Sequence, residues 1–138
     1  MIYVSITRSF TLPADQVWSL LSNWGDTQWL TKELTPEVFT SEEGVVRRFH
    51  NPGMPPLDET LLSADTESRT LLYKIAQSPL MPLANYNGRV VVKPVDDGCE
   101  VEWSCTFSRG GLEVSEAEAK ASANIDKLLN CMETFLMQ

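Results

Sequence analysis

An arginine and a glutamate, Arg47 and Glu59, are the ionisable residues of this sequence whose spacing best suits them to chemistry. Each has apolar residues two positions away on both sides, so it shares one face of a strand with them. These flanking residues are Val45 and Phe49 for Arg47, and Leu57 and Leu61 for Glu59. A charge on an apolar face is costly unless it is paired. We therefore expect an ion pair, which either anchors a ligand carboxylate or carbonyl or closes the rim of a sheet.

The same pair, together with Tyr73, also suits acid–base catalysis. Glu59 would act as the general base, and Arg47 or Tyr73 would stabilise an enolate or oxyanion. His50 is the only histidine and is expected at a loop edge, so no Ser-His-Asp or Cys-His arrangement emerges. No metal-ligand spacing surrounds it. We expect neither a metal nor a cofactor.

Aromatic and aliphatic residues on the neighbouring strand faces could either pack in the core or contact a ligand. A tyrosine, for example, offers a ligand an apolar body with a hydrogen-bonding tip. The expected ligand-binding residues are Trp29, Arg47, Phe49, Glu59, Tyr73, Ile75, Tyr86, Trp103, Phe107, Ala121, Asn124 and Leu128. Trp29 is the expected aromatic residue at the entrance. Met54 and Met81, in two proline-containing loops, are expected to flank the same opening.

A curved sheet must position these residues. Alternating apolar and polar residues predict strands over Ile2–Thr11, Glu37–Ser41, Val45–His50, Leu57–Ala64, Thr70–Ala76, Asn85–Lys93 and Glu100–Phe107. Short turns join the last six, so these strands are antiparallel to their neighbours. Two short helices are expected after the first strand. One begins near Pro13 and ends at Gly25, and a short second one carries Trp29.

A long C-terminal helix is expected to cover the sheet, running from Ser115 to Met137. Ser115 and Glu118 match a capping box, and neither glycine nor proline interrupts the rest. The expected inner stripe is Ala117, Ala121, Asn124 or Ile125, Leu128, Met132 and Phe135. This stripe begins with small residues and ends with bulky ones. A helix of this kind fills only half of a curved sheet, which indicates a cavity.

Composition limits the classes of function. With 138 residues, of which 43% are hydrophobic and 22% charged, residues 1–138 are expected to form a single globular domain. The formal net charge of −8 argues against nucleic acids and anionic membrane surfaces as partners. No apolar run approaches a membrane span of about 20 residues. Three cysteines without CxxC spacing favour free thiols in a reducing compartment. We expect a cytoplasmic monomer or homodimer.

The order of elements resembles a known superfamily over the whole chain. The residues that carry the resemblance are Pro13–Leu21, Trp29, Gly44–Arg47, Glu59, Leu61, Asp65, Tyr73–Ile75, Pro79–Pro82, Tyr86, Val101–Trp103 and Phe107. In this order they resemble the START-like, Bet v 1-like helix-grip superfamily, the polyketide cyclase/dehydrase and lipid transport (SRPBCC) proteins. The resemblance implies an α+β fold, with a curved seven-stranded antiparallel sheet wrapped around a long C-terminal helix.

The resemblance also implies a hydrophobic cavity for lipids, polyketides, plant hormones or aromatic metabolites. In the hormone-receptor branch, loops placed like residues 51–56 and 78–83 act as a gate and a latch. The gate of that branch reads Ser-Gly-Leu-Pro-Ala, whereas residues 51–56 here read Asn-Pro-Gly-Met-Pro-Pro. A mobile entrance is therefore implied, and hormone binding is not.

Three functions remain open from the sequence. The first is a non-enzymatic carrier of a small hydrophobic ligand such as a lipid, a polyketide or an aromatic metabolite. The second is a cyclase, aromatase or hydrolase that uses Glu59 and Arg47 in the same cavity. The third is a protein-interaction module with an incidental cavity. Residual cavity volume separates the first from the third, and loss of turnover on Glu59→Gln identifies the second.

Overall fold

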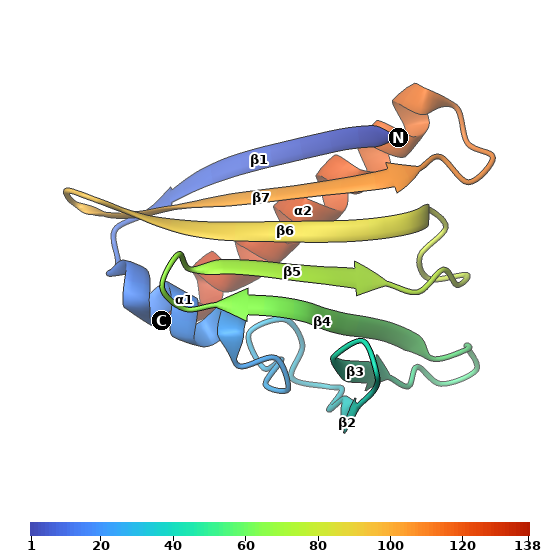
Figure 1. Ribbon diagram of the computed structural model, residues 1–138, viewed down its shortest axis with the longest axis horizontal. Coiled ribbons are helices and arrows are strands. Elements are labelled where there is room, and N and C mark those ends of the chain that lie inside the picture. The colour runs from blue at the N-terminus through green and yellow to red at the C-terminus, as the bar shows by residue number, and fades with distance from the viewer.

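Seven antiparallel strands form one curved sheet in the computed structural model, which describes residues 1–138 (Figure 1). The strands are β1 (Ile2–Phe10), β2 (Glu37–Thr40), β3 (Val45–Phe49), β4 (Leu57–Asp65), β5 (Thr70–Ile75), β6 (Ala84–Val95) and β7 (Gly98–Ser108). Their spatial order is β1-β7-β6-β5-β4-β3-β2. Every strand is therefore hydrogen-bonded to its sequence neighbour except β1, which closes the sheet beside β7. All seven strands predicted from alternation are confirmed.

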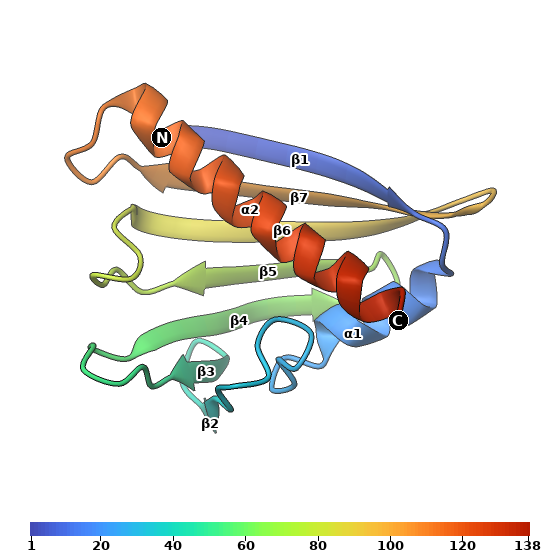
Figure 2. The same cartoon turned by 180° about the vertical axis from the view of Figure 1, so that it is seen from behind.

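The long helix α2 (Val114–Leu136) crosses one face of this sheet diagonally (Figure 2). Its backbone approaches β1 and β7 closely and makes no comparable approach to β3, β4 or β5. The space between helix and sheet therefore widens toward β3–β5. This α+β arrangement is the helix-grip fold expected from the sequence.

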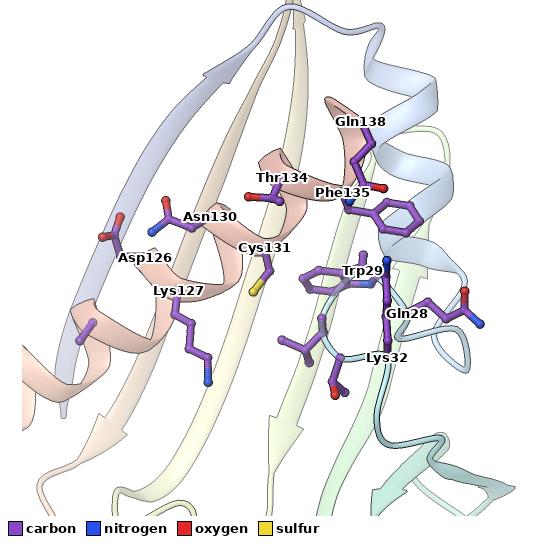
Figure 3. A pocket seen from close by; sticks show the side chains of 13 residues that line it. Gln28, Trp29, Lys32, Asp126, Lys127, Asn130, Cys131, Thr134, Phe135 and Gln138 are labelled. Atoms are coloured by element: carbon purple, nitrogen blue, oxygen red, sulfur yellow. The ribbon is translucent and has the colours of Figure 1, made fainter.

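A single helix, α1 (Ala14–Ser22), follows β1, where two short helices were predicted. The second is reduced to one hydrogen-bonded turn, in which Leu30 and Thr31 both donate their amides to the carbonyl of Thr27 at 2.9 Å. A stretch this short satisfies few backbone groups by itself. Trp29, held in this turn, is nevertheless only 5% exposed, because the turn packs against α2 (Figure 3).

Helix α2 differs from its prediction at its start and in its rotation. It begins at Val114 after Glu113, and no side chain caps it, so the capping box expected at Ser115 and Glu118 is not formed. Its buried residues are Ala117, Ala121, Ile125, Leu129 and Met132. Leu128 was expected on this buried face but is only half-buried, as are Asn124 and Phe135. Because the helix lies close to β1 and β7, its deepest face is turned toward those strands.

The core occupies the space between α2, α1 and the inner face of the sheet. The expected inner faces of β5, β6 and β7 are confirmed, since Leu71, Tyr73, Ile75, Tyr86, Val90, Val92, Val101, Trp103, Cys105 and Phe107 are all buried. Phe107 stacks on Tyr86 with 6.2 Å between ring centroids. None of the helices is both long enough and apolar enough to span a membrane.

Candidate functional site

A pocket of about 360 Å³ opens where α2 diverges from the sheet. We call it the sheet pocket. It is lined by Leu30, Thr31, Leu34, Arg47, Phe49, Asn51, Leu57, Glu59, Tyr73, Ile75, Leu80, Met81, Trp103, Asn124, Lys127 and Leu128. Most of this wall is aromatic or aliphatic. The polar groups are few and come mainly from β3, β4, β5 and one side of α2.

Arg47 and Glu59 form the expected ion pair on the wall of the sheet pocket. They are direct cross-strand partners of β3 and β4, and Arg47 Nε donates to Glu59 Oε1 at 2.7 Å. The side chains are 7% and 12% exposed. The other carboxylate oxygen, Glu59 Oε2, accepts no hydrogen bond from the protein yet is not sealed off from the pocket. The pair thus offers a ligand an open carboxylate oxygen without presenting net charge.

Trp24 holds this pair in place from behind. The guanidinium of Arg47 lies 3.6 Å from the centroid of the Trp24 ring and donates through Nη1 to the Trp24 carbonyl at 3.2 Å. The indole of Trp24 donates in turn to the backbone carbonyl of Glu59 at 3.2 Å. Stacking and hydrogen bonding together fix the arginine in one orientation. A ligand entering the pocket therefore meets a preformed polar group.

Tyr73 provides the second polar group of the wall. Its hydroxyl accepts a hydrogen bond from Trp103 Nε1 at 2.9 Å, and its own proton has no acceptor in the protein. Burial raises the pKa of the Tyr73 hydroxyl well above its ordinary value. The group therefore stays protonated and is available as a hydrogen-bond donor.

Gly88 makes this position of Tyr73 possible. The two residues are cross-strand partners of β5 and β6, and a β-carbon on Gly88 would lie 2.2 Å from the Tyr73 ring. With only hydrogen at Gly88, the ring lies across β6 and reaches Trp103 on β7. The absence of one side chain thus brings two aromatic residues from different strands together.

A second, smaller pocket of about 210 Å³ adjoins the first, which we call the inner pocket. Its lining consists of Leu80, Met81, Pro82, Leu83, Tyr86, Lys120, Ala121 and Asn124. Leu80, Met81 and Asn124 also line the sheet pocket. Ala121, from the small start of the expected helical stripe, is one of these lining residues.

Tyr86 lines the inner pocket, and its hydroxyl is buried without any hydrogen-bond partner. Tyr86 as a whole is 1% exposed. Burial raises the pKa of this hydroxyl far above its ordinary value. An unpartnered buried hydroxyl costs stability.

Of the remaining expected site residues, three lie outside both pockets: Trp29, Phe107 and Met54. Trp29 lies in a neighbouring groove, and Phe107 is fully buried beneath Tyr86. Met54 is 42% exposed and lines neither pocket, whereas Met81 is 8% exposed and lines both. Only one of the two methionines therefore lines the pockets.

The structure adds lining residues that the sequence analysis missed. They are Leu30, Thr31, Leu34, Asn51, Leu57, Leu80 and Lys127 in the sheet pocket, and Lys120, Pro82 and Leu83 in the inner pocket. Most of them lie in turns and loops, where no periodic pattern marks the inward side. Leu57 is the exception, because it lies two positions from Glu59 on the same strand face, so alternation in the sequence could have identified it.

A shallow groove of about 510 Å³ runs between the 27–32 turn and the C-terminal half of α2. Figure 3 shows Trp29 of the turn beside Cys131 and Phe135 of the helix. We call it the helix groove. It shares Leu30, Thr31 and Lys127 with the sheet pocket. The three residues therefore form a common rim between groove and pocket.

Other reactive groups lie apart from the pockets. His50 is exposed and contacts Glu37 Oε1 at 2.9 Å. All three cysteines are free, and burial raises the pKa of the Cys99 and Cys105 thiols. No three His, Cys, Asp or Glu side chains are grouped as a metal site would require.

The fold and these pockets can be compared with known proteins. The family model described as polyketide cyclase/dehydrase and lipid transport matches residues 1–134. The chain belongs to this family. No curated protein is significantly similar to it in sequence.

Solved structures share the fold along nearly the whole length of this family member. An uncharacterized protein from Bacillus thuringiensis is 22% identical with a TM-score of 0.82, over 99% of this chain and 100% of that one. Norcoclaurine synthase from Thalictrum flavum, in complex with dopamine and hydroxybenzaldehyde, is 14% identical with a TM-score of 0.72, over 99% and 86%. The di-domain ARO/CYC protein BexL from the BE-7585A biosynthetic pathway is 16% identical with a TM-score of 0.75, over 97% and 46%. At identities this low, the TM-scores show a common fold and nothing further.

Proposed function

We propose that this protein binds a small, largely apolar molecule with a neutral hydrogen-bonding group, such as an aryl ketone or a phenol, in the sheet pocket. The observation that carries the proposal is the composition of the wall, which is mostly apolar with a few fixed polar groups. Small-molecule sites generally have this composition, and their volumes begin at about 300 Å³. The volume of about 360 Å³ suits a ligand of one or two rings.

The polar groups favour a neutral ligand group at the back of the pocket. Glu59 already neutralises Arg47 through the 2.7 Å contact. The proton of Tyr73 suits a carbonyl oxygen, and the free Oε2 of Glu59 suits a hydroxyl or an amide. Since Trp24 and Trp103 hold these groups in position, the ligand pays little to order them.

A protein of the same fold supports the choice of a small aromatic ligand. Norcoclaurine synthase was solved with dopamine and hydroxybenzaldehyde, each a single aromatic ring with polar substituents. This family member has a comparable fold and an aromatic wall formed by Phe49, Tyr73 and Trp103. We extend the ligand class to it on those grounds.

A pair of matched variants tests the proposal. Leu128→Trp enlarges a half-buried side chain that lines the sheet pocket, and Leu72→Trp makes the same change on the outer face of β5, where Leu72 is 37% exposed. The affinity for 2-acetylnaphthalene is measured by competition: the ligand is titrated into protein that holds the neutral dye Nile red, and the loss of bound dye is recorded. We expect Leu128→Trp to weaken binding at least tenfold and Leu72→Trp to leave it unchanged. Equal affinities in both variants would reject the sheet pocket as the site.

Enzymatic enolisation is a second candidate, favoured by Glu59 Oε2 and the Tyr73 hydroxyl lining one pocket. Glu59 would take a proton from the carbon next to a ligand carbonyl, and Tyr73 would donate a hydrogen bond to the enolate oxygen. Such a step is the first in an intramolecular aldol cyclisation.

Proton exchange tests this candidate without knowledge of the natural substrate. The methyl protons of 2-acetylnaphthalene are followed by NMR in deuterated water, with wild-type protein, Glu59→Gln and Leu72→Trp. Accelerated exchange that is lost only in Glu59→Gln would support catalysis. Exchange at the rate of free solution in all three proteins would leave binding alone.

A further inference from the structure

Most basic residues of this acidic protein are neutralised by a carboxylate. Ion pairs within 4.0 Å engage Arg8, Arg47, Arg48, His50, Arg69, Lys74, Arg89 and Lys93. The cationic side chains without such a partner are Lys32, Arg109, Lys120 and Lys127. An unpaired cation is unremarkable in a basic protein. In a chain with a formal charge of −8, carboxylates are abundant, so the position of the unpaired cations is informative.

Three of these four cations lie around the openings of the pockets. Lys127 lines both the sheet pocket and the helix groove, Lys32 lines the helix groove, and Lys120 lines the inner pocket. Lys120 and Lys127 are seven residues apart on α2, about 10 Å along one side of the helix. Asn124, between them in sequence, lines both the sheet pocket and the inner pocket.

The carboxylates near these openings do not offset the lysines. Asp126, the one acidic residue of the helix groove, is already paired with Arg8 at 2.5 Å. Glu59, the one acidic residue of the sheet pocket, is paired with Arg47. The inner pocket contains no acidic residue. Among the residues that line the three cavities, the lysines are therefore the charged side chains without an ion-pair partner.

We propose that the ligand is an anionic amphiphile. Its apolar body lies in the sheet pocket, and its negatively charged end, a carboxylate or a phosphate, stays at the mouth, where Lys127 of the rim and Lys32 of the helix groove are unpaired cations. This inference rests on the proposed function and adds the charge of the ligand and its direction of entry. A buried anion would have to compete with Glu59 for Arg47, whereas an anion at the rim meets unpaired ammonium groups and keeps part of its hydration.

The position of the rim fits this orientation. Lys127 belongs to the rim shared by groove and pocket, and Figure 3 shows Lys127 on α2 and Lys32 on the facing turn. A ligand whose body enters beneath α2 leaves its head group at this rim. The overall negative charge of the protein repels anions at long range, so selectivity for an anion has to come from these nearby lysines.

Three ten-carbon ligands with different head groups test the inference. Displacement of Nile red by decanoate, decyl phosphate and decanol is measured in three proteins. These are the wild type, the double variant Lys32→Gln/Lys127→Gln and Arg109→Gln. Arg109 is the matched control, because it is an unpaired cation that lines none of the three cavities. Comparison of decanoate with decyl phosphate distinguishes a carboxylate from a phosphate ligand.

We expect at least one anion to bind the wild type about tenfold more tightly than decanol does. The double variant should lose most of this preference, and Arg109→Gln should keep it. Raising the salt concentration from about 0.1 M to 1 M should also reduce it, because exposed charges are screened. If decanol binds as tightly as both anions, or if the double variant keeps the preference, the inference is overturned and the proposed function stands. If none of the three displaces the dye while 2-acetylnaphthalene does, the inference alone is overturned; if 2-acetylnaphthalene also fails to displace it, both fail.

Discussion

Arg47 and Glu59 face each other across β3 and β4 inside the sheet pocket, and the adjacent residues repeat the pairing on the outer face. There Arg48 donates to Asp58 through two hydrogen bonds, at 2.6 and 2.9 Å. Both pairs are direct cross-strand neighbours in the same register. The outer pair is more exposed, with 33% and 28% of its side chains accessible. Comparison with the outer pair therefore shows how burial changes the coupling energy of the inner pair.

The inner pair should be strongly coupled in a double-mutant cycle. Removing one partner leaves an uncompensated buried charge, which costs about 3–5 kcal/mol. We expect Arg47→Met to cost more than Glu59→Leu, because it also loses the contacts with Trp24. The double variant should recover about 1–3 kcal/mol relative to the sum of the single variants. The corresponding cycle at Arg48 and Asp58 should give a smaller coupling.

Urea unfolding of the variants from both cycles provides the comparison. Equal coupling energies for the inner and outer pairs would show that the pocket solvates Arg47 and Glu59 as well as the partly exposed outer face solvates Arg48 and Asp58. In that case the fixed polar group assumed for ligand binding would lose its basis.

The two pocket tyrosines should respond in opposite ways to loss of the hydroxyl. Tyr86→Phe removes an unpartnered buried hydroxyl and should stabilise the protein by about 1 kcal/mol. Tyr73→Phe leaves Trp103 Nε1 without its acceptor and should destabilise it by about 1–3 kcal/mol. Thermal unfolding of the two single variants measures both signs. A loss of stability in Tyr86→Phe would reveal a partner for its hydroxyl.

Gly88 should tolerate no side chain while Tyr73 is present. The β-carbon of Gly88→Ala would lie 2.2 Å from the Tyr73 ring, and overpacking of this kind costs about 1–3 kcal/mol. In a Tyr73→Val background the same substitution should be nearly neutral. Denaturant unfolding of the four proteins gives the coupling. If Gly88→Ala lowers the stability equally in both backgrounds, the Tyr73 ring does not occupy the space above Gly88.

Alkaline pH should destabilise the protein through its buried tyrosines. Burial raises the pKa of Tyr73 and Tyr86 in the folded state above the ordinary value of 10.0. Their contribution is fully present below pH 10 and is lost as the pH rises, because the unfolded chain then binds fewer protons. A Tyr73→Phe/Tyr86→Phe variant should lose less stability above pH 10, by about 2.7 kcal/mol per pH unit. Equal slopes for variant and wild type would contradict the burial of these hydroxyls.

Strand positions and the inner ion pair could be predicted because they follow from local pattern. Alternation places Arg47 and Glu59 on the same face, and the short connection between their strands sets the register that brings them together. The cost of burying a charge then requires them to pair. The same reasoning located Tyr73, Tyr86 and Trp103 on the inner side of the sheet.

The shape of the pocket could not be predicted in this way. Which residues of α2 face inward depends on how the helix is rotated against β1 and β7, so Leu129 takes the buried position expected for Leu128. The rim formed by Leu30, Thr31 and Lys127 joins a turn to a helix far away in sequence. The orphan hydroxyl of Tyr86 likewise emerges only when the surrounding elements are packed.

Chemical-shift mapping of a bound ligand tests the central claim most directly. Amide spectra of the 15N-labelled protein are recorded while 2-acetylnaphthalene is added. We expect saturable shifts that shrink in Leu128→Trp and that cluster at the lining residues Leu30, Thr31, Leu34, Leu80, Met81, Asn124, Lys127 and Leu128. Saturable shifts confined to the helix groove around Thr134 and Phe135, or no saturable shifts at all, would contradict binding in the sheet pocket.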